Sequence, residues 1–517
     1  MKTMEVIMKR ALISVYNKSG IVEFAEKLVG MDWEIISTGG TYRLLLENGI
    51  EAREIDEITK FPEILDGRVK TLNPRIHGGI LFRRDKEDHR RVIEEMGIFP
   101  IHMVVNNLYP FEETVTKKEV GMEEAIENID IGGPSMIRAA AKNFQDVTVL
   151  IDPADYNKVL LELRQEGDTR PETRLELARK VFNYTAYYDA LIAQFFNELC
   201  QETFPDYLTL AYKKKDQLRY GENPHQNAAF YTDYSQTEGT IAGAKQLHGK
   251  ELSYNNINDG NGAISIVKEF EEPAAIAVKH GNPCGAGVGK TIVEAFEKAY
   301  ESDTESIFGG IVALNREVTK ELAERLSKIF LEIIIAPSFS VEALELLMEK
   351  KNVRLLQIPE LSESSYTKPM AKQVEGGMLL QDRNRLLLQD DMEIASKRFP
   401  EEDELDDMVF AWKIAKHISS NGVVIAKDGA TLGIGLGEVN RFWAVQKAIE
   451  RAGDKTSGAA LASDGFFPFK DSIEALAQAG ISSVIQPGGS VRDAEVIKEA
   501  DLNNMAMVFT GIRHFRH

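Results

Sequence analysis

The sequence has little cysteine: two among 517 residues, Cys200 and Cys284, which lie 84 positions apart. Neither has a second cysteine nearby at the spacing of metal ligands. A disulfide framework and a Cys-rich zinc site are therefore excluded, and we expect two free thiols.

Long apolar runs and an excess of positive charge are also missing. No stretch of about 18 apolar residues occurs, and the N-terminus lacks the apolar segment and small-residue cleavage site of a secretory signal. The 81 acidic and 61 basic residues leave a net charge of -20, which repels nucleic acid and anionic membranes. We expect a cytoplasmic protein that binds neither nucleic acid nor membrane.

Glycine and proline are few enough, at 39 and 17 residues, to exclude a collagen-like or largely disordered chain. Hydrophobic residues make up 43% of the sequence, which indicates a well-packed core. The length predicts at least two domains.

The first part of the chain has the alternating pattern of parallel α/β units. It predicts strands at 11–15 and 34–36 and helices at 21–29 and 41–48. Further elements are expected in the same domain, namely strands at 102–105 and 147–151 and a helix at 172–198. We therefore predict one α/β domain over residues 1–205.

A second α/β region is predicted over residues 206–517, after a segment at 205–217 that mixes Pro, aromatic residues and three lysines. A polar stretch at 361–372 is a candidate seam within it, and the sequence shows no internal repeat. The predicted strands lie at 274–278, 332–335, 423–426, 483–485 and 505–509, with helices at 320–329 and 441–452.

A Gly-rich loop follows the second predicted strand and opens a helix; it consists of Ser37, Thr38, Gly39, Gly40 and Thr41. Free backbone N–H groups at a helix start suit a phosphate. Ser14 and Lys18 follow the preceding strand, so they belong to the same carboxyl edge of the sheet. Taken alone, the loop fits either a phosphate site or an ordinary turn.

Other polar residues of the first domain allow two interpretations each. Arg68 and Lys70 would lie on one side of an extended segment, either as cations in a pocket or in a solvated loop. Asn107 and Tyr109 follow a strand and offer an amide and a phenol, although the ring also suits buried packing.

Asp130 precedes a predicted helix that has Pro134 in its first turn and Lys142 near its far end. The helix rises about 12 Å from Pro134 to Lys142, so Asp130 and Lys142 can approach different parts of one nucleotide-sized ligand.

In the second region, Lys279 and His280 end a strand before a Gly-rich turn, where they offer a cation and a titratable base. The turn leads to Cys284, in a segment similar to half of a zinc deaminase signature. The second cysteine and the His-x-Glu partner of that signature are absent, so we expect no zinc.

Five segments resemble, in order, the motifs of one family, the bifunctional purine-biosynthesis proteins that join an IMP cyclohydrolase to an aminoimidazole-carboxamide ribonucleotide (AICAR) transformylase. The resemblance covers nearly the whole chain. The segments are 218–226 (LRYGENPHQ), 278–280 (VKH), 466–471 (FFPFKD), 486–490 (QPGGS) and 513–517 (RHFRH).

The resemblance implies an N-terminal methylglyoxal-synthase-like domain and a C-terminal pair of cytidine-deaminase-like lobes without zinc. It implies formyl transfer from the co-substrate 10-formyltetrahydrofolate to AICAR, followed by closure of the formylated product to IMP with loss of water. The partners expected from it are these small molecules and a second copy of the chain in a homodimer.

By the same resemblance, His280 accepts a proton from the attacking amine, Lys279 stabilises the developing oxyanion and Asn421 positions the amine. Further residues match family positions that bind nucleotide or folate. They are Arg219, Tyr220, Gly309, Glu332, Arg441, Phe466, Asp471, Ser490 and Arg513.

In the first domain, the resemblance implies that Ser14, Lys18, Arg68, Thr71 and the 37–41 loop hold the ribose phosphate, with Asn107 also binding substrate. The residues implied to surround the closing ring are Lys70, Tyr109, Asp130 and Lys142. Which of these act as acid or base stays open.

Two residues depart from the family pattern: Glu438 stands where Gln is more common, and Gly465 where Ala is more common. Glu438 would weaken anion binding if its side chain faced the pocket. A catalytically silent nucleotide-binding regulatory protein is the alternative function. The combined presence of Lys70, Tyr109, Lys142, Lys279 and His280 argues against it.

Overall fold

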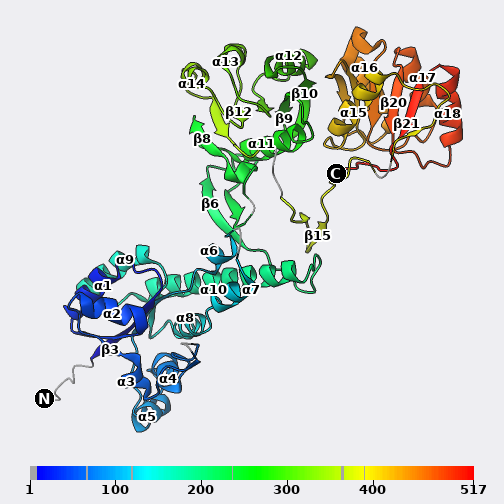
Figure 1. Ribbon diagram of the computed structural model, residues 1–517. Helices are drawn as coiled ribbons and strands as arrows, with labels where there is room; N and C mark the ends of the chain where they lie inside the picture. Colours follow the sequence, from blue (N-terminus) through cyan, green and yellow to red (C-terminus); the bar gives the residue numbers. More distant parts are fainter. Residues whose placement is uncertain (1–7, 66–67, 118–119, 236, 362–365, 389–390) are drawn as a thin grey trace. The chain divides into compact units, whose positions relative to one another are not determined.

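The computed structural model describes residues 8–65, 68–117, 120–235, 237–361, 366–388 and 391–517 (Figure 1). The chain divides into two compact units, residues 1–212 and 213–517. The division lies seven residues after the expected end of the first domain. Of the candidate seam at 361–372, residues 362–365 lie outside the described residues.

Unit 1 contains a five-stranded sheet in the order β3-β2-β1-β4-β5, in which every pairing is parallel. The strands are β1 (Lys9–Val15), β2 (Trp33–Ser37), β3 (Arg53–Glu54), β4 (Met103–Asn107) and β5 (Thr148–Leu150). The helices are α1 (Ile21–Val29), α2 (Gly39–Glu47), α3 (Ile55–Thr59), α4 (Pro74–Leu81), α5 (Glu87–Glu95), α6 (Phe111–Val115), α7 (Met122–Glu127), α8 (Gly132–Lys142), α9 (Tyr156–Glu166) and α10 (Pro171–Leu199).

The strand order of this sheet reverses between β1 and β4. The chain builds outward from β1 to β2 and β3 on one side and returns through β4 and β5 on the other. Open parallel sheets bind ligands at the carboxyl ends of their strands where the order reverses. Ser14 and Asn106, which pair across β1 and β4, lie at this point.

Unit 2 is built around a twelve-stranded sheet in the order β16-β21-β20-β19-β17-β18-β10-β9-β11-β12-β13-β8. Its first-half strands are β8 (Lys245–His248), β9 (Ala274–Lys279), β10 (Asn282–Val288), β11 (Ile311–Leu314), β12 (Ile333–Ala336) and β13 (Arg354–Gln357). Its second-half strands are β16 (Glu393–Ile394), β17 (Val423–Lys427), β18 (Ala430–Gly435), β19 (Ala460–Ser463), β20 (Ser483–Gln486) and β21 (Ala506–Phe509).

The two halves of this sheet have the same topology, although the sequence shows no repeat. From the central β10–β18 pair outward, the strand order of each half is identical. Helices α11 (Tyr254–Val267) and α15 (Glu402–Ala415) share one core on one face of the sheet. The other face packs against α12 (Ile292–Ser302), α13 (Lys320–Leu326) and α14 (Val341–Met348) in the first half, and against α16 (Arg441–Ala452), α17 (Asp471–Gln478) and α18 (Asp493–Leu502) in the second.

The repeat is visible in the glycines that let a helix approach its strand. Added Cβ atoms on Gly285 and Gly433 would each lie 2.1 Å from a helix carbonyl oxygen, that of Ala299 in α12 and that of Ala448 in α16. These two glycines are 148 positions apart. One pair of glycines at this spacing is too little similarity to be seen in the sequence, which explains why no repeat was predicted.

The predicted elements agree with the structure, and α1 and α16 have the predicted bounds. The 213–215 lysines were expected in a segment between the two domains. They instead belong to strand β6 (Tyr212–Leu218), which pairs with β7 (Ala228–Asp233), and they are exposed. A further hairpin consists of β14 (Met370–Val374) and β15 (Gly377–Gln381).

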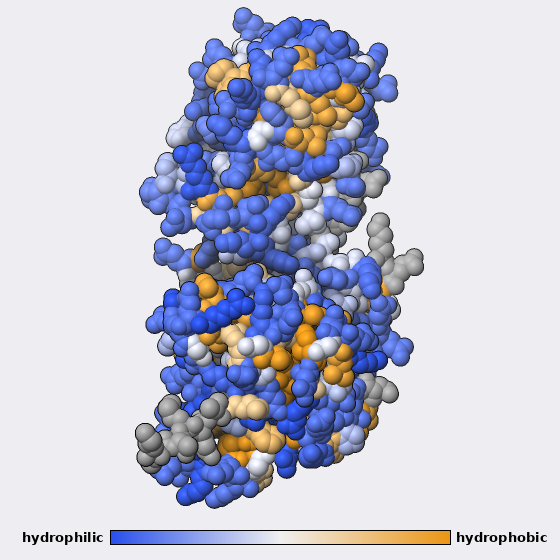
Figure 2. All heavy atoms as spheres, turned by 90° about the vertical axis from the view of Figure 1, so that its left-hand side faces the viewer, coloured by the Kyte–Doolittle hydropathy of each residue, from blue (hydrophilic) through white to orange (hydrophobic). Residues whose placement is uncertain are grey.

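Hydrophilic side chains cover most of the face drawn in Figure 2, between separate areas of apolar side chains. Of the helices formed by the described residues, none has both the length and the apolar character needed to span a membrane.

Candidate active sites

The Gly-rich loop of unit 1 joins β2 to α2 and lies against the end of β1. Ser14 Oγ and Thr38 Oγ1 are 2.7 Å apart, and Lys18 Nζ donates to Thr41 Oγ1 at 2.9 Å. Burial lowers the pKa of Lys18. Hydroxyls, a cation and the first N–H groups of α2 therefore converge on one edge, which is the donor set that a phosphate needs.

The Arg68–Thr71 segment approaches this loop and the start of α8. A Cβ added to Gly39 would lie 3.0 Å from Lys70 Nζ, so the Lys70 ammonium lies over the Gly-rich loop. Lys70 also forms an ion pair with Glu63. Arg68 instead pairs with Glu127 and is largely exposed.

Tyr109 and Asp130 form the next part of this edge. Asp130 Oδ1 accepts a hydrogen bond from Gly133 N at 2.8 Å. Burial raises the pKa of Asp130, although backbone donors at Gly133, Tyr109 and Gly132 oppose the shift. Burial and the Asp130 charge raise the pKa of Tyr109, so its phenol stays protonated near neutral pH.

Asn107 and Lys142 occupy different positions from this group. Asn107 Oδ1 accepts from Tyr16 N at 2.6 Å and Asn17 N at 2.8 Å, so it shapes the loop after β1. Lys142 ends α8, about 15 Å along the helix from Gly132. Within this unit, Lys142 and Asp130 therefore lie at opposite ends of α8.

In unit 2, Lys279 and His280 lie at the hairpin that joins β9 to β10. His280 and Gly281 form its two-residue turn, with φ values of 54° and 73°. The strand thus ends at Lys279. Adjacent residues of a regular strand face opposite ways, so this break lets both side chains serve one substrate. Asp259 Oδ2 accepts from His280 N at 3.0 Å, and Lys279 Nζ donates to Phe308 O at 2.8 Å.

Strand directions bring five further predicted residues of unit 2 to this same edge of the sheet. Strands β19, β20 and β21 are parallel, and their carboxyl ends precede Phe466, Ser490 and Arg513. Because β11 and β9 are antiparallel, Gly309 before β11 lies beside the end of β9. Asn421 precedes β17, which is antiparallel to β19, so it lies at this edge as well.

Hydrogen bonds connect the hairpin of the first half to the Ser419–Asn421 segment of the second. Asn282 Nδ2 donates to His280 O at 3.1 Å, and Ser419 Oγ lies 3.4 Å from Asn282 Oδ1. Arg441 Nη2 then donates to Asn421 Oδ1 at 2.8 Å. This network passes through the backbone of Ser419–Asn421 and links the carbonyl oxygen of His280 to the Arg441 guanidinium.

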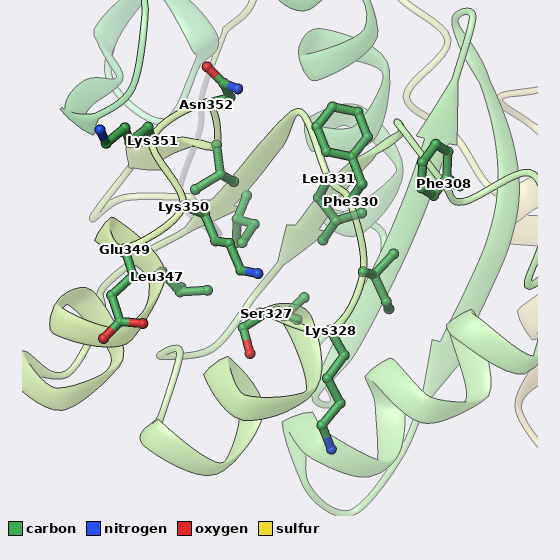
Figure 3. Close-up of a pocket in the computed structure, with 14 residues that line it drawn as sticks. Phe308, Ser327, Lys328, Phe330, Leu331, Leu347, Glu349, Lys350, Lys351 and Asn352 are labelled. Carbon is green, nitrogen blue, oxygen red and sulfur yellow. The ribbon is translucent and has the colours of Figure 1, made fainter.

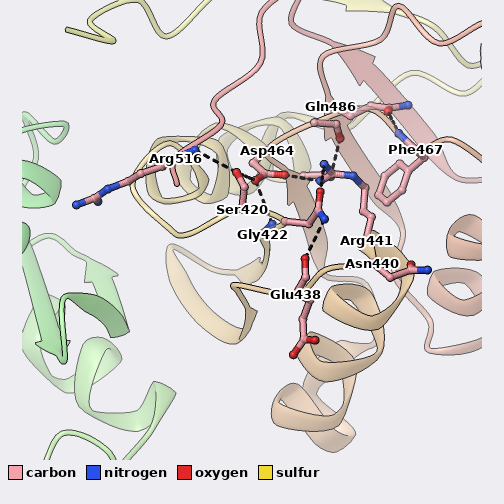
Figure 4. Close-up of polar contacts among 12 residues, drawn as sticks. Ser420, Gly422, Glu438, Asn440, Arg441, Asp464, Phe467, Gln486 and Arg516 are labelled. Carbon is pink, nitrogen blue, oxygen red and sulfur yellow. Dashed lines mark hydrogen bonds and ion pairs between the residues drawn. The ribbon is translucent and has the colours of Figure 1, made fainter. Parts of the chain in front are cut away.

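The network ends in a buried ion pair between Arg441 and Asp464, shown in Figure 4. Asp464 Oδ2 also accepts from Ser420 Oγ at 2.6 Å and from Gly422 N at 3.1 Å. The C-terminal tail closes the group, because Ser420 N donates to Arg516 O at 2.9 Å and Arg516 N to Ser420 Oγ at 3.1 Å.

The other predicted binding residues are placed less closely. Glu332 accepts from Asn256 Nδ2 at 2.9 Å and lies 3.4 Å from Arg354. Arg219 is exposed, 5.7 Å from the ring of Tyr220. Asp471 begins α17, and Phe466 is 38% exposed.

A cavity of about 520 Å³ opens beside Phe308, one residue from Gly309 (Figure 3). The rings of Phe308 and Phe330 flank it, with centroids 5.3 Å apart, and the Lys350 ammonium points into it. Apolar side chains such as Leu331 and Leu347 line the remainder. Aromatic rings beside a cation suit an aromatic anion.

The two departures from the family pattern have different settings. The Glu438 side chain turns away from Arg441 in Figure 4 and lies 3.3 Å from Lys447 Nζ, so it does not oppose an anion beside Arg441. At Gly465, an added Cβ would lie 2.6 Å from Arg441 Nη2 and 2.6 Å from Phe515. Glycine therefore lets both side chains lie close to this backbone.

No group of three or more His, Cys, Asp or Glu side chains able to hold a metal occurs in the part of the chain that the structure describes. Burial raises the pKa of Cys284 to about 12, so its thiol stays protonated at neutral pH.

Sequence reasoning missed Asn282, Ser420 and Asp464. Asn282 and Asp464 each stand next to segments that were considered, but nothing in their local pattern distinguishes them from turn residues. Their partners are 137 and 23 residues away in the chain, and only the fold brings them together.

Comparisons with known proteins show the family of this chain. A family model described as AICARFT/IMPCHase bienzyme matches residues 140–451, and one described as MGS-like domain matches residues 20–135. The relatives named Bifunctional purine biosynthesis protein PurH from Anoxybacillus flavithermus and Bacillus subtilis are each 55% identical over 510 residues, which cover 98% of this chain and 100% and 99% of theirs. A solved chain titled "Crystal structure of ForH" is 39% identical and covers 37% of this chain and 99% of its own; its TM-score of 0.33 supports no argument.

Proposed function

Because the chain belongs to the family of AICARFT/IMPCHase bienzymes, we propose that each of its two units carries one of the family's two activities. The chain is a bifunctional enzyme of purine biosynthesis, an AICAR formyltransferase and an IMP cyclohydrolase, which confirms the function predicted from its motifs. Its α/β architecture with an MGS-like first domain is likewise confirmed. We assign the cyclohydrolase to residues 1–212 and the formyltransferase to residues 213–517.

The observation that carries this assignment is the network from the His280 turn to Arg441. Through the His280 carbonyl oxygen, it links the turn that carries the base His280, and that follows the cation Lys279, to the segment that carries the Asn421 amide, on one edge of the sheet. A formyl transfer needs these three groups, because a weakly nucleophilic ring amine must lose a proton while the formyl oxygen gains charge.

In the proposed transfer, the AICAR amine attacks the formyl carbon of 10-formyltetrahydrofolate and gives its proton to His280. The electron pair of the formyl C=O moves to oxygen, where the Lys279 ammonium stabilises it. The C–N10 bond of the folate then breaks, N10 takes a proton, and the formylated nucleotide remains. Asn421, held by Arg441, orients the amine.

In the proposed cyclisation, the carboxamide nitrogen attacks the formyl carbon and the formyl oxygen gains negative charge beside Lys70. The C–O bond then breaks, and the oxygen leaves as water with one proton from each ring-forming nitrogen. Asp130, whose pKa burial raises, transfers protons, and Tyr109 donates a hydrogen bond. The Ser14, Lys18 and 37–41 group holds the phosphate.

The cavity beside Phe308 is the proposed site of the co-substrate's aromatic and glutamate portions. Its rings match the aromatic part, and Lys350 matches a carboxylate. Lys350→Ala should raise the KM for formyl-folate roughly 5-fold, the scale of one exposed charge contact, and leave the KM for AICAR unchanged. An unchanged folate KM would remove the cavity from the site.

We also propose a homodimer. Large apolar side chains are exposed near the formyl-transfer edge, with Phe308 at 59%, Val439 at 87% and Trp443 at 48%. Covering them against a second chain would bury apolar area beside the site. Sedimentation at assay concentrations would contradict this if it gave only monomers.

The direct test of the proposed function is the formation of IMP from AICAR and 10-formyltetrahydrofolate by the full-length chain, with the formylated intermediate supplied separately in a second assay. Both reactions are expected. A chain that binds AICAR but catalyses neither reaction would instead be the silent regulatory protein.

A further inference from the structure

Asp464 is fully buried, and fixed donors occupy both of its carboxylate oxygens. Oδ1 pairs with Arg441, and Oδ2 accepts from Ser420 Oγ and Gly422 N. Arg441, which is 7% exposed, passes this constraint to Asn421 through its 2.8 Å hydrogen bond to Oδ1. The carboxylate therefore lies one residue behind the groups that face substrate.

The amide of Asn421 is held at both of its polar atoms. Its Nδ2 donates to Glu438 O at 2.8 Å, and its Oδ1 accepts from Arg441. A primary amide has two N–H donors and two acceptor lone pairs. One of each stays available in a fixed direction, which is what the orientation of a reacting amine requires.

The first half of the sheet provides an internal control for this carboxylate. Asn315 follows β11 as Asp464 follows β19, and it makes the same backbone pairing. Its Oδ1 accepts from Ala274 N at 2.8 Å and its N–H donates to Ala274 O at 3.3 Å, as Asp464 does with Gly422. A neutral amide oxygen therefore suffices for this backbone hydrogen bond, and the Asn315 Nδ2 donates to Phe270 O and Glu272 O.

The residue that begins the helix facing this position also differs between the two halves of the sheet. Arg441 is the first residue of α16, and the first residue of α12 is Ile292, which has no charge to neutralise. The negative charge thus occurs only in the half that carries the guanidinium. Because a neutral side chain holds the backbone equally well in the other half, the charge at residue 464 serves Arg441.

We propose that Asp464 is a positioning residue of the formyl-transfer site, which holds the Arg441 guanidinium, and through it the Asn421 amide, in the orientation that transfer needs. The proposal rests on the formyltransferase function assigned to this unit. Asp464 does not touch the substrate in this proposal. Its negative charge acts through Arg441, while its contacts with Ser420 and Gly422 hold the backbone on either side of Asn421.

The first test is Asp464→Asn in the full-length chain, which keeps the size of the side chain and its backbone hydrogen bonds. Formyl-transfer kcat/KM should fall roughly 30-fold, while cyclisation on the other unit stays at the wild-type rate. The matched control is Asp407→Asn, which alters another buried carboxylate of the same half, one that binds Asp428 N and Gly429 N but no arginine. It should leave transfer within about 2-fold of wild type.

A double-mutant cycle separates positioning from a structural role. If Asp464 acts through Arg441, then Arg441→Met/Asp464→Asn should transfer formyl groups at the same rate as Arg441→Met alone. This comparison holds even if Asp464→Asn alone folds poorly, since the double variant buries no unpaired charge. A further loss of roughly 30-fold in the double variant, or wild-type transfer by Asp464→Asn, would overturn the proposal. Absence of transfer in the wild-type chain would instead overturn the proposed function.

Discussion

At the scale of single residues, His280, the proposed proton acceptor, has an unusual backbone conformation. Its φ of 54° is matched by the φ of 53° at Asp428, which occupies the corresponding turn of the second half of unit 2. Asp259 and Asp407 bind the two turns through their backbone N–H groups. The turn therefore accepts small polar residues, and the imidazole of His280 is not needed to form it.

His280→Asn should accordingly preserve the fold and remove the proton acceptor. We expect formyl transfer to fall roughly 100-fold or more, the usual contribution of a general base, with cyclisation unchanged. Rates of both reactions and the melting temperature would be measured, with Asp428→Asn as the matched turn control. Equal loss of both activities would show that His280 has a structural role.

Lys70 is the corresponding residue of unit 1, because its ammonium lies over the Gly-rich loop beside Gly39. Lys70→Ala should lower cyclisation roughly 100-fold, on the scale of one lost oxyanion contact, and leave formyl transfer intact. The exposed Lys86 supplies the control, since Lys86→Ala removes a cation that makes no contact with the loop. If Lys70→Ala impaired formyl transfer and not cyclisation, the cyclohydrolase would be misplaced.

At the scale of elements, the C-terminal tail after β21 is anchored by the buried His514 and by backbone hydrogen bonds of Arg516. His514 is fully buried, its Nδ1 accepts from Asn384 Nδ2 at 2.8 Å, and its ring lies 4.5 Å from that of Trp412. His514 N donates to Asp464 O at 2.9 Å. The backbone N and O of Arg516 form hydrogen bonds with Ser420 Oγ and Ser420 N. The tail is thus part of the support of Asn421.

The buried His514 makes this tail sensitive to acid. Burial, followed by the charge of Lys416, lowers the pKa of His514 to about 4. Unfolding restores a pKa near 6.5, so the unfolded chain binds the extra proton and stability falls as the pH decreases from about 6.5 towards 4. Between pH 7 and pH 5, His514 should account for a loss of roughly 2 kcal/mol.

Thermal unfolding of the full-length chain at these two pH values, followed for unit 2, would measure this loss. His514→Gln, which does not titrate, should show a smaller decrease in stability on acidification by about that amount. Equal decreases in the wild type and the variant would indicate that His514 takes up no proton on unfolding.

At the scale of the whole molecule, the two units should work separately. The segment between the end of α10 at Leu199 and the start of β6 at Tyr212 contains Thr209, whose carbonyl accepts from Gln194 Nε2 at 3.1 Å. A fragment of residues 1–210 keeps this contact and ends before β6, so the cut divides no strand. It should cyclise the formylated nucleotide at a rate near that of the full chain and transfer no formyl group. A folded fragment without cyclisation would contradict the assignment of activities to units.

Local pattern alone determined most of the elements. Apolar residues at helical spacing predicted α1, and short apolar runs between turn residues predicted strands such as β9 and β17, because burial of one face depends on neighbours in the chain. The same reasoning placed Lys279 and His280 at a strand end. The family's motifs supplied the activities, which composition and charge could not.

Only the tertiary structure decided how these elements combine. It made two halves of one sheet from segments without visible repetition, and it brought Asn282 to Ser419 and Asp464 to Arg441. The physical reason is that such contacts join residues far apart in the chain, and their energies arise from packing and burial that no local pattern records. His280, which we propose as the proton acceptor, is therefore visible in the sequence, whereas the buried carboxylate of Asp464, which we propose orients the site, appears only in the fold.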